Sequence, residues 1–389
     1  ITLVSAFGAA IAAANTLACV FTLTRRWPAA VFAAMSLAFA HTFWQKATLT
    51  ETYTLAAALL SGECWCLIVY ARTRRPIYLW AMLLLNGLGI SNHPLALLTV
   101  PILAVVILYA IRLNHLPIHH VAVGAALWLL GASLYGVMVV QEWARSGDAW
   151  ATIGSALFGH GYRDDVLNLR MSGDHVARSA AYLAMNFPNL LLPIAVYGLV
   201  RSVQRSLFPL ARRVLIAAFV MHAVFALRYP IVDQHTFFLP MYVLLSIFGG
   251  IGFAEICRWS EMSNRAIVFI AAYGSLGLTP VLYAVSPDWA RQYRVLESVE
   301  LHKPYRDDYV YMFTPWSIVE RSAERMSREA VALAGADGII VVEDRMAEFA
   351  VRYQALRADY DELQIVRSLP AEMARDAVDG HRPVVLVPA

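Results

Sequence analysis

The sequence predicts an α-helical polytopic membrane protein with about ten transmembrane helices and a small α/β domain at its C-terminal end. Of the 389 residues, 59% are hydrophobic and only 15% are charged. Soluble globular domains carry about 25% charged residues, and the mean hydropathy here is +0.56. The net charge of +3 is small, and the basic residues are scattered rather than gathered in one patch, so no nucleic-acid partner is expected. Membrane lipid is the expected surrounding of most of the chain.

Long apolar runs occupy the first three quarters of the chain. About 20 apolar residues in a helix cross the hydrocarbon layer. The expected spans are residues 1–23, 28–43, 52–70, 77–91, 95–111, 121–140, 182–200, 214–227, 238–256 and 266–285. Together they predict a transmembrane domain over residues 1–285.

The basic residues predict how these spans are oriented, because Lys and Arg accumulate in short cytoplasmic loops. One set of alternate loops holds Arg25, Arg26, Arg72, Arg74, Arg75, Arg112, Arg201, Arg205, Arg212, Arg213, Arg258 and Arg265. The other short loops hold only Lys46 and Arg228, and the longer loop at 141–181 mixes arginines with acidic residues. This alternation places the second set, and everything after residue 286, on the outer side of the membrane.

The tail after residue 286 has a different pattern. Residues 316–334 alternate apolar and charged side chains at helical spacing, and a second helical stretch follows at about 345–359. Apolar runs at 338–342, 363–369 and 383–388 are typical of strands. Strands that alternate with helices predict a small, partly parallel α/β sheet, so residues 286–389 are expected to form an extracytoplasmic soluble domain.

Some polar and small residues inside the spans have structural interpretations. Glu63 is expected to form a hydrogen bond with Asn86 or His222 of neighbouring helices, and the other interpretation is a buried functional group. Ala132 and Gly136, four positions apart, are expected to allow close helix packing.

The four cysteines are interpreted as small apolar packing residues, because no pair has the spacing of a metal site. They are Cys19, Cys64, Cys66 and Cys257. Neither a metal ion nor another cofactor is therefore expected.

Three groups of polar residues lie at ends of spans on the expected outer side. A charge within a span costs about 2.5–3.5 kcal/mol at mid-helix, so ionisable groups beside the membrane are functional candidates. The first group contains Lys46, Glu51 and Tyr53, and the second is the turn around His93. Interfacial anchoring explains Lys46 equally well, a helix dipole explains Glu51, and a tight turn explains His93.

The third group is the loop from Arg228 to Pro240, which places an arginine, Asp233 and His235 among aromatic residues. A structural ion pair between Arg228 and Asp233 is one interpretation. The other is a phosphate clamp, because the planar guanidinium presents donors suited to phosphate oxygens.

The same stretches carry a resemblance to a known family. They are Phe43-Trp44-Gln45-Lys46-Ala47, Glu51-Thr52-Tyr53-Thr54-Leu55, Gly87-Leu88-Gly89-Ile90-Ser91-Asn92-His93, the segment from Tyr229 to Pro240, the segment from Arg306 to Tyr311 and the segment from Gly338 to Asp344. With these motifs the chain resembles the protein O-mannosyltransferases of the glycosyltransferase C superfamily, in their bacterial branch.

The resemblance implies an inverting glycosyltransferase that uses no nucleotide sugar. It would move mannose or another hexose from a polyprenyl-phosphate donor to a protein, lipid or glycan acceptor on the outer face of the bacterial inner membrane, with the C-terminal domain in the periplasm. The family's catalytic acid lies in the first outer loop, so the catalytic residue is expected upstream of Ile1.

Roles for this chain's residues follow as hypotheses. Lys46 and Arg228 would stabilise the donor phosphate, while the sugar or acceptor pocket would be lined by Glu51, Tyr53, His93, Asp233 and His235. The alternative from another class is a transporter or lipid-carrier flippase without transferase activity. The sequence shows no evident inverted repeat and no broken helices at matching positions of two halves, which argues against that alternative.

Overall fold

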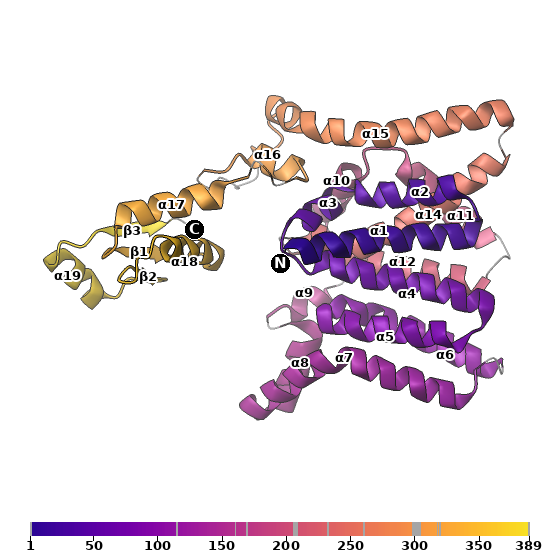
Figure 1. Cartoon of the computed structure of the whole chain (residues 1–389), viewed down its shortest axis with the longest axis horizontal. Coiled ribbons are helices and arrows are strands. Elements are labelled where there is room, and N and C mark those ends of the chain that lie inside the picture. The colour runs from indigo at the N-terminus through magenta and orange to yellow at the C-terminus, as the bar shows by residue number, and fades with distance from the viewer. Residues whose placement is uncertain are drawn as a thin grey trace. The chain divides into compact units, whose positions relative to one another are not determined.

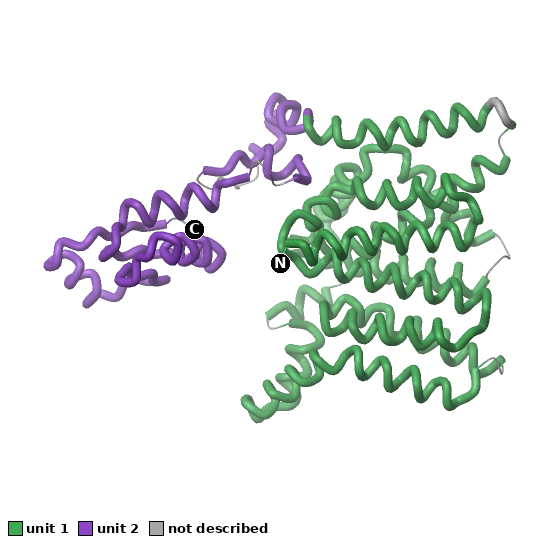
Figure 2. The backbone as a smooth tube through the Cα atoms, in the orientation of Figure 1, with its two compact units in different colours: residues 1–284 green, residues 285–389 purple. Residues whose placement is uncertain are grey.

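The computed structural model describes residues 2–113, 116–159, 161–168, 170–204, 209–231, 233–259, 261–297, 305–316, 318 and 320–387. Arg205, Val319 and Pro388, which the sequence interpretation used, lie outside these ranges. Contacts within the chain define two compact units, unit 1 from Ile1 to Ala284 and unit 2 from Val285 to Ala389 (Figure 2).

Unit 1 is built from helices, as expected of a helical membrane protein. Among the described residues, seven helical stretches are long and apolar enough to cross a membrane. They are α1 (Thr2–Thr24), α4 (Tyr53–Thr73), η1 with α6 (Pro94–Thr99 and Val100–Arg112), α7 (Ile118–Ser146), α12 (Pro209–Arg228), α14 (Leu239–Trp259) and α15 (Met262–Gln292). The bent pair α10 (Gly173–Asn186) and α11 (Leu191–Gln204) makes an eighth if it is counted as one span.

Shorter helices complete unit 1 (Figure 1). They are α2 (Trp27–Ala38), α3 (His41–Thr48), α5 (Pro76–Asn92), α8 (Ala149–Phe158), α9 (Arg163–Leu167) and α13 (Gln234–Phe237). The helices therefore indicate an integral membrane protein, whereas the expected count of ten spans is not confirmed.

The span expected at residues 182–200 is not one helix. The chain bends by 104° between α10 and α11, directly at Phe187 and Pro188. Proline disfavours helical backbone in the residue before it and donates no hydrogen bond, so the helix ends there. The apolar composition of residues 182–200 predicted one continuous span and did not predict this break.

The span expected at residues 28–43 is also divided, because α2 ends at Ala38 and α3 begins at His41. No proline causes this break, and the partners that stabilise it are distant in sequence. Asn186 Oδ1 accepts a hydrogen bond from the Thr42 backbone N–H at 2.7 Å. The Tyr283 hydroxyl lies 3.0 Å from the Phe39 carbonyl oxygen and 3.1 Å from the Asn186 carbonyl oxygen, so one side chain reaches both breaks.

Close helix contacts depend on glycines other than the one expected. A Cβ on Gly87 of α5 would lie 2.2 Å from the Trp128 carbonyl oxygen, and a Cβ on Gly131 of α7 would lie 2.7 Å from the Leu84 carbonyl oxygen. A Cβ on Gly136 would meet nothing within 4 Å. The expected close packing at Ala132 and Gly136 is therefore wrong for Gly136, which lies on another face of α7.

Helix α14 runs through the core of unit 1, and most of its residues are buried. It packs against α11, where a Cβ on Gly198 would lie 1.9 Å from the Phe248 carbonyl oxygen, and against α2, α1 and α12. A helix that is apolar all round is expected at such a place.

The Glu63 side chain forms the interhelical hydrogen bond expected with Asn86. Glu63 Oε2 accepts from Asn86 Nδ2 and from Thr99 Oγ1, each at 3.3 Å, while Asn86 Oδ1 accepts from Trp128 Nε1 at 2.9 Å. His222 lines the same small cavity of about 20 Å³ as Glu63 but forms no hydrogen bond with it among the described atoms. This polar network joins four helical segments, which favours its structural interpretation.

Unit 2 holds a three-stranded parallel sheet in the order β2-β1-β3. The strands are β1 (Ile339–Val342), β2 (Gln364–Val366) and β3 (Val384–Val387), and the helices are α16 (Asp308–Phe313), α17 (Ser322–Ala334), α18 (Arg345–Arg357) and α19 (Ala371–Asp379). Each strand lies within a run expected from sequence. Helix α17 begins six residues later than the expected helix at 316–334.

Candidate functional site

The three polar groups singled out in the sequence lie at one end of unit 1. Two short helices there carry one of these residues each: α3 contains Lys46 and α13 contains His235. The Ser5 hydroxyl of α1 contacts the backbone of Glu51 at 3.0 Å, and Asn92 Nδ2 donates to the Thr52 carbonyl oxygen at 3.1 Å. The start of α1, the α3–α4 junction and the end of α5 therefore meet at this place, which we call the polar end.

Lys46 is buried at the polar end. Its Nζ atom lies 2.8 Å from Glu51 Oε1, and the two side chains are 11% and 33% exposed. Nζ also lies 5.7 Å from the centre of the Tyr53 ring. An ammonium group held by one carboxylate and one aromatic face keeps further donor capacity for another anion.

Aromatic contacts join the first group to the other two. The Tyr53 ring centre lies 5.3 Å from that of His93 and 5.7 Å from that of Phe237, and the rings of His93 and Phe237 are 5.8 Å apart. Residues that are distant in sequence therefore form one cluster of rings.

Both histidines of the predicted site are neutral near pH 7. Burial lowers the pKa of His93 to about 4. Burial and, to a lesser degree, the positive charge of Lys46 lower the pKa of His235 to about 4. His93 Nδ1 accepts a hydrogen bond from the Leu95 backbone N–H at 3.2 Å, so its proton lies on Nε2, which is a donor.

Helix α13 is fixed by a residue that the sequence did not single out. Gln234 is fully buried, and its Nε2 atom lies 2.9 Å from His175 Nε2 of α10 and 2.8 Å from the Ala226 carbonyl oxygen. The ring of Tyr182, also on α10, lies 5.8 Å from His235. In the sequence, only its position inside the polar loop pointed to Gln234. Nothing pointed to His175 or Tyr182, because the sequence did not predict the bend after α10.

Arg228 and Asp233 do not form the ion pair considered from sequence within the part of the chain that is described. Arg228 Nη1 instead donates to the carbonyl oxygens of Val166 and Asn168, the latter at 2.7 Å. Its guanidinium lies 5.5 Å from the centre of the Phe225 ring. Asp233 is exposed and precedes α13. Arg228 thus holds Val166 and Asn168 at the end of α12.

Next to Arg228, burial raises the pKa of Tyr229 to about 12, with smaller contributions from the negative charges of Asp165 and Asp233. The Tyr229 ring packs on Phe237 with 4.9 Å between ring centres. Its hydroxyl is therefore protonated at neutral pH.

The polar end thus combines the buried ammonium group of Lys46, the carboxylate of Glu51, the neutral imidazoles of His93 and His235 and several aromatic faces. Such a set can bind an anionic group beside hydroxyl-rich or apolar ligands. Within the described ranges, no group of three or more His, Cys, Asp or Glu residues could hold a metal ion.

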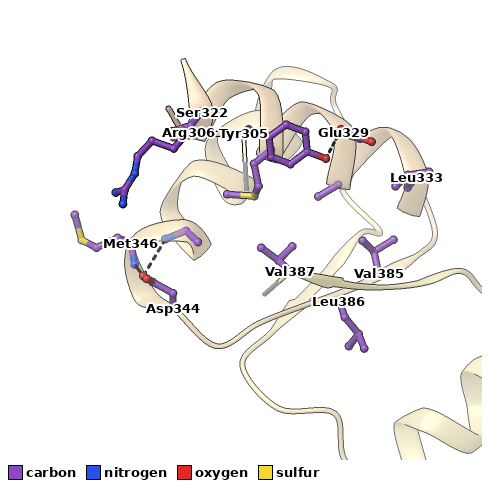
Figure 3. A pocket seen from close by; sticks show the side chains of 14 residues that line it. Tyr305, Arg306, Ser322, Glu329, Leu333, Asp344, Met346, Val385, Leu386 and Val387 are labelled. Carbon is purple, nitrogen blue, oxygen red and sulfur yellow. Dashed lines mark hydrogen bonds between the residues drawn. The ribbon is translucent and has the colours of Figure 1, made fainter. Parts of the chain in front are cut away.

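Unit 2 has a hollow of its own, of about 390 Å³ (Figure 3). Apolar residues of α17, α18 and β3 line most of it, and the Tyr305 hydroxyl donates a short hydrogen bond to Glu329 at its rim. Asp344 caps α18 there by accepting from the Met346 and Ala347 backbone N–H groups, which gives that carboxylate a structural task.

Residues 1–116 match the family model described as the protein O-mannosyl-transferase TMEM260 N-terminal domain. No curated protein matches the chain. The matched segment runs from α1 through α6 and contains Lys46, Glu51, Tyr53 and His93, so it supports an O-mannosyltransferase-like family and a glycosyltransferase activity.

Proposed function

We propose that the protein transfers mannose or another hexose from a polyprenyl-phosphate donor to an acceptor on the outer face of a bacterial inner membrane, with unit 2 in the periplasm. The observation that carries this proposal is the convergence of Lys46, Glu51, Tyr53 and His93 at one end of unit 1. All four lie in the segment that matches a protein O-mannosyl-transferase domain.

Charge separation at the two ends supports the outer location. The described arginines of the predicted cytoplasmic loops lie at or next to the C-terminal ends of α1, α4, α6, α11 and α14 and the N-terminal ends of α2, α5, α12 and α15, at the end opposite the polar end (Figure 1). Because short cytoplasmic loops carry the basic residues, the polar end faces outwards.

In the proposed reaction the acceptor hydroxyl loses its proton to a general base, and its oxygen bonds to the anomeric carbon of the sugar. The bond between that carbon and the phosphate oxygen breaks, and the electron pair leaves with the phosphate. The base is a carboxylate, as the resemblance implies. Inversion at the anomeric carbon follows from this single displacement.

Lys46 stabilises the charge that develops on the leaving phosphate, and Glu51 holds its ammonium group in place. Arg228 contributes through Nε and Nη2, which donate to no other group within the described part of the chain. Glu51, Tyr53, His93, Asp233 and His235 line the sugar or acceptor pocket, where the Nε2–H group of His93 donates to a sugar oxygen.

The test is transfer of radiolabelled sugar from polyprenyl-phosphate mannose in membranes that contain the full-length protein. Arg228→Ala is expected to abolish transfer with normal expression. Arg228→Lys keeps the positive charge but loses the planar set of donors that binds the carbonyl oxygens of Val166 and Asn168. Transfer by this variant would show that the charge at the phosphate matters more than these two contacts. Wild-type protein that transfers no label from mannosyl or other hexosyl donors would contradict the proposal and favour a transporter or flippase.

A further inference from the structure

Two connections at the end opposite the polar end share one design. The sequences are Thr24-Arg25-Arg26-Trp27-Pro28 and Thr73-Arg74-Arg75-Pro76, which we call the first and second arginine turns. The leading arginines, Arg25 and Arg74, both adopt left-handed backbone, with φ of 57° and 56°. Each arginine that follows, Arg26 or Arg75, occupies the N-cap of the next helix. The two turns are therefore a natural matched pair.

The first arginine turn lies beside a hollow that the second does not line. This hollow of about 250 Å³ has Arg25 and Arg26 among its lining residues. Its other side is apolar, with Phe253 of α14 and Phe269 of α15 packed edge to face at 5.2 Å. A cationic rim thus adjoins a hydrocarbon-like wall.

The two arginines at this hollow have no carboxylate partner among the residues described. The Arg25 guanidinium lies over the Phe21 ring, 5.6 Å from its centre. Trp27 stacks on the same ring at 4.4 Å and is 59% exposed. Tryptophan is enriched where spanning helices meet the lipid headgroups, so the hollow lies at headgroup depth.

We propose that the first arginine turn binds an anionic phospholipid. The headgroup phosphate lies on Arg25 and Arg26, whose planar guanidinium groups suit phosphate oxygens. An acyl chain packs on Phe269, which is partly exposed, while Phe253 lies fully buried behind it. A free phosphate would leave this wall unused, and the donor bound at Lys46 lies at the opposite end of the helices.

The experiment measures lipid retention on the full-length protein in detergent by native mass spectrometry, with phosphatidylglycerol or phosphatidylcholine added. The variant is Arg25→Gln with Arg26→Gln, and the matched control is Arg74→Gln with Arg75→Gln. Each basic side chain at an anionic surface contributes about fivefold, so the first variant is expected to bind phosphatidylglycerol about 25-fold more weakly. The control is expected to bind as the wild type does.

Two further arms keep the result interpretable if the double variant folds poorly. Arg25→Lys with Arg26→Lys retains both charges and is expected to retain most of the binding. Glycerol phosphate without acyl chains is expected not to displace the lipid. Equal retention of both lipids, equal loss in both glutamine variants, or displacement by glycerol phosphate would overturn the proposal.

Discussion

The two ends of unit 1 differ in how their charged side chains are stabilised. At the polar end, Lys46 is paired with Glu51, and broken helices surround both residues. At the opposite end, Arg25 and Arg26 adjoin a hollow without an ion pair to any described carboxylate. A buried charge needs a partner, whereas an arginine at the headgroups finds water or lipid.

This difference agrees with the proposed reaction at the polar end and the proposed lipid binding at the opposite end. Short helices α3, α10 and α13 position the polar end, and their directions are fixed by side chains from distant segments. Two of the described connections at the other end are short turns, between α1 and α2 and between α4 and α5. The variants below test whether the two ends are as different in energy as they are in structure.

The largest effect is expected from Lys46→Gln. Removing one group that stabilises developing charge typically lowers the rate by about 10²–10³, so transfer of labelled sugar is expected to fall at least about 100-fold. Arg75→Gln at the opposite end removes an equal charge and is expected to leave transfer unchanged. Similar losses in the two variants would show that overall charge, rather than position, supports activity.

A smaller effect is expected from Tyr283→Phe, which removes a buried hydroxyl near two helix breaks. The unpaired carbonyl oxygens should cost about 2 kcal/mol of unfolding free energy. The matched control is Tyr273→Phe, because the Tyr273 hydroxyl donates to the Pro28 carbonyl oxygen at 2.6 Å in an exposed position. That control is expected to cost about 0.5–1 kcal/mol, since water can replace the bond.

Thermal unfolding in detergent measures both tyrosine variants. A loss for Tyr273→Phe as large as that for Tyr283→Phe would contradict the idea that the polar end depends on the more exacting contacts. Reduced transfer by Tyr283→Phe protein that remains folded would link the helix breaks to activity.

Much of this architecture was predictable from local pattern. Apolar runs located the long helices, alternating arginines separated the two ends, and the polar loops located residues that do meet, such as Tyr53 and His93. Chemical type and spacing suffice where a residue's environment is set by its neighbours in sequence.

The remainder depended on contacts between distant segments. The break between α2 and α3 has its partners at Asn186 and Tyr283, and the anchor of α13 lies at His175. Gly131, rather than Gly136, meets α5 because its face of α7 points there. Contacts between distant segments determine where these helices break and which face of each helix is packed, and hydrophobicity along the sequence does not predict those contacts.

The smallest effect concerns His235, whose pKa falls to about 4 through burial and the charge of Lys46. An unfolded histidine has a pKa near 6.5, so below that pH the unfolded state binds the extra proton and the folded state loses stability. Lowering the pH from about 7.5 to about 6 should cost about 0.5–1 kcal/mol for this residue. His235→Gln should reduce that dependence in thermal unfolding, while Arg75→Gln should not. An unchanged pH dependence in His235→Gln would show that His235 is not held neutral at the polar end.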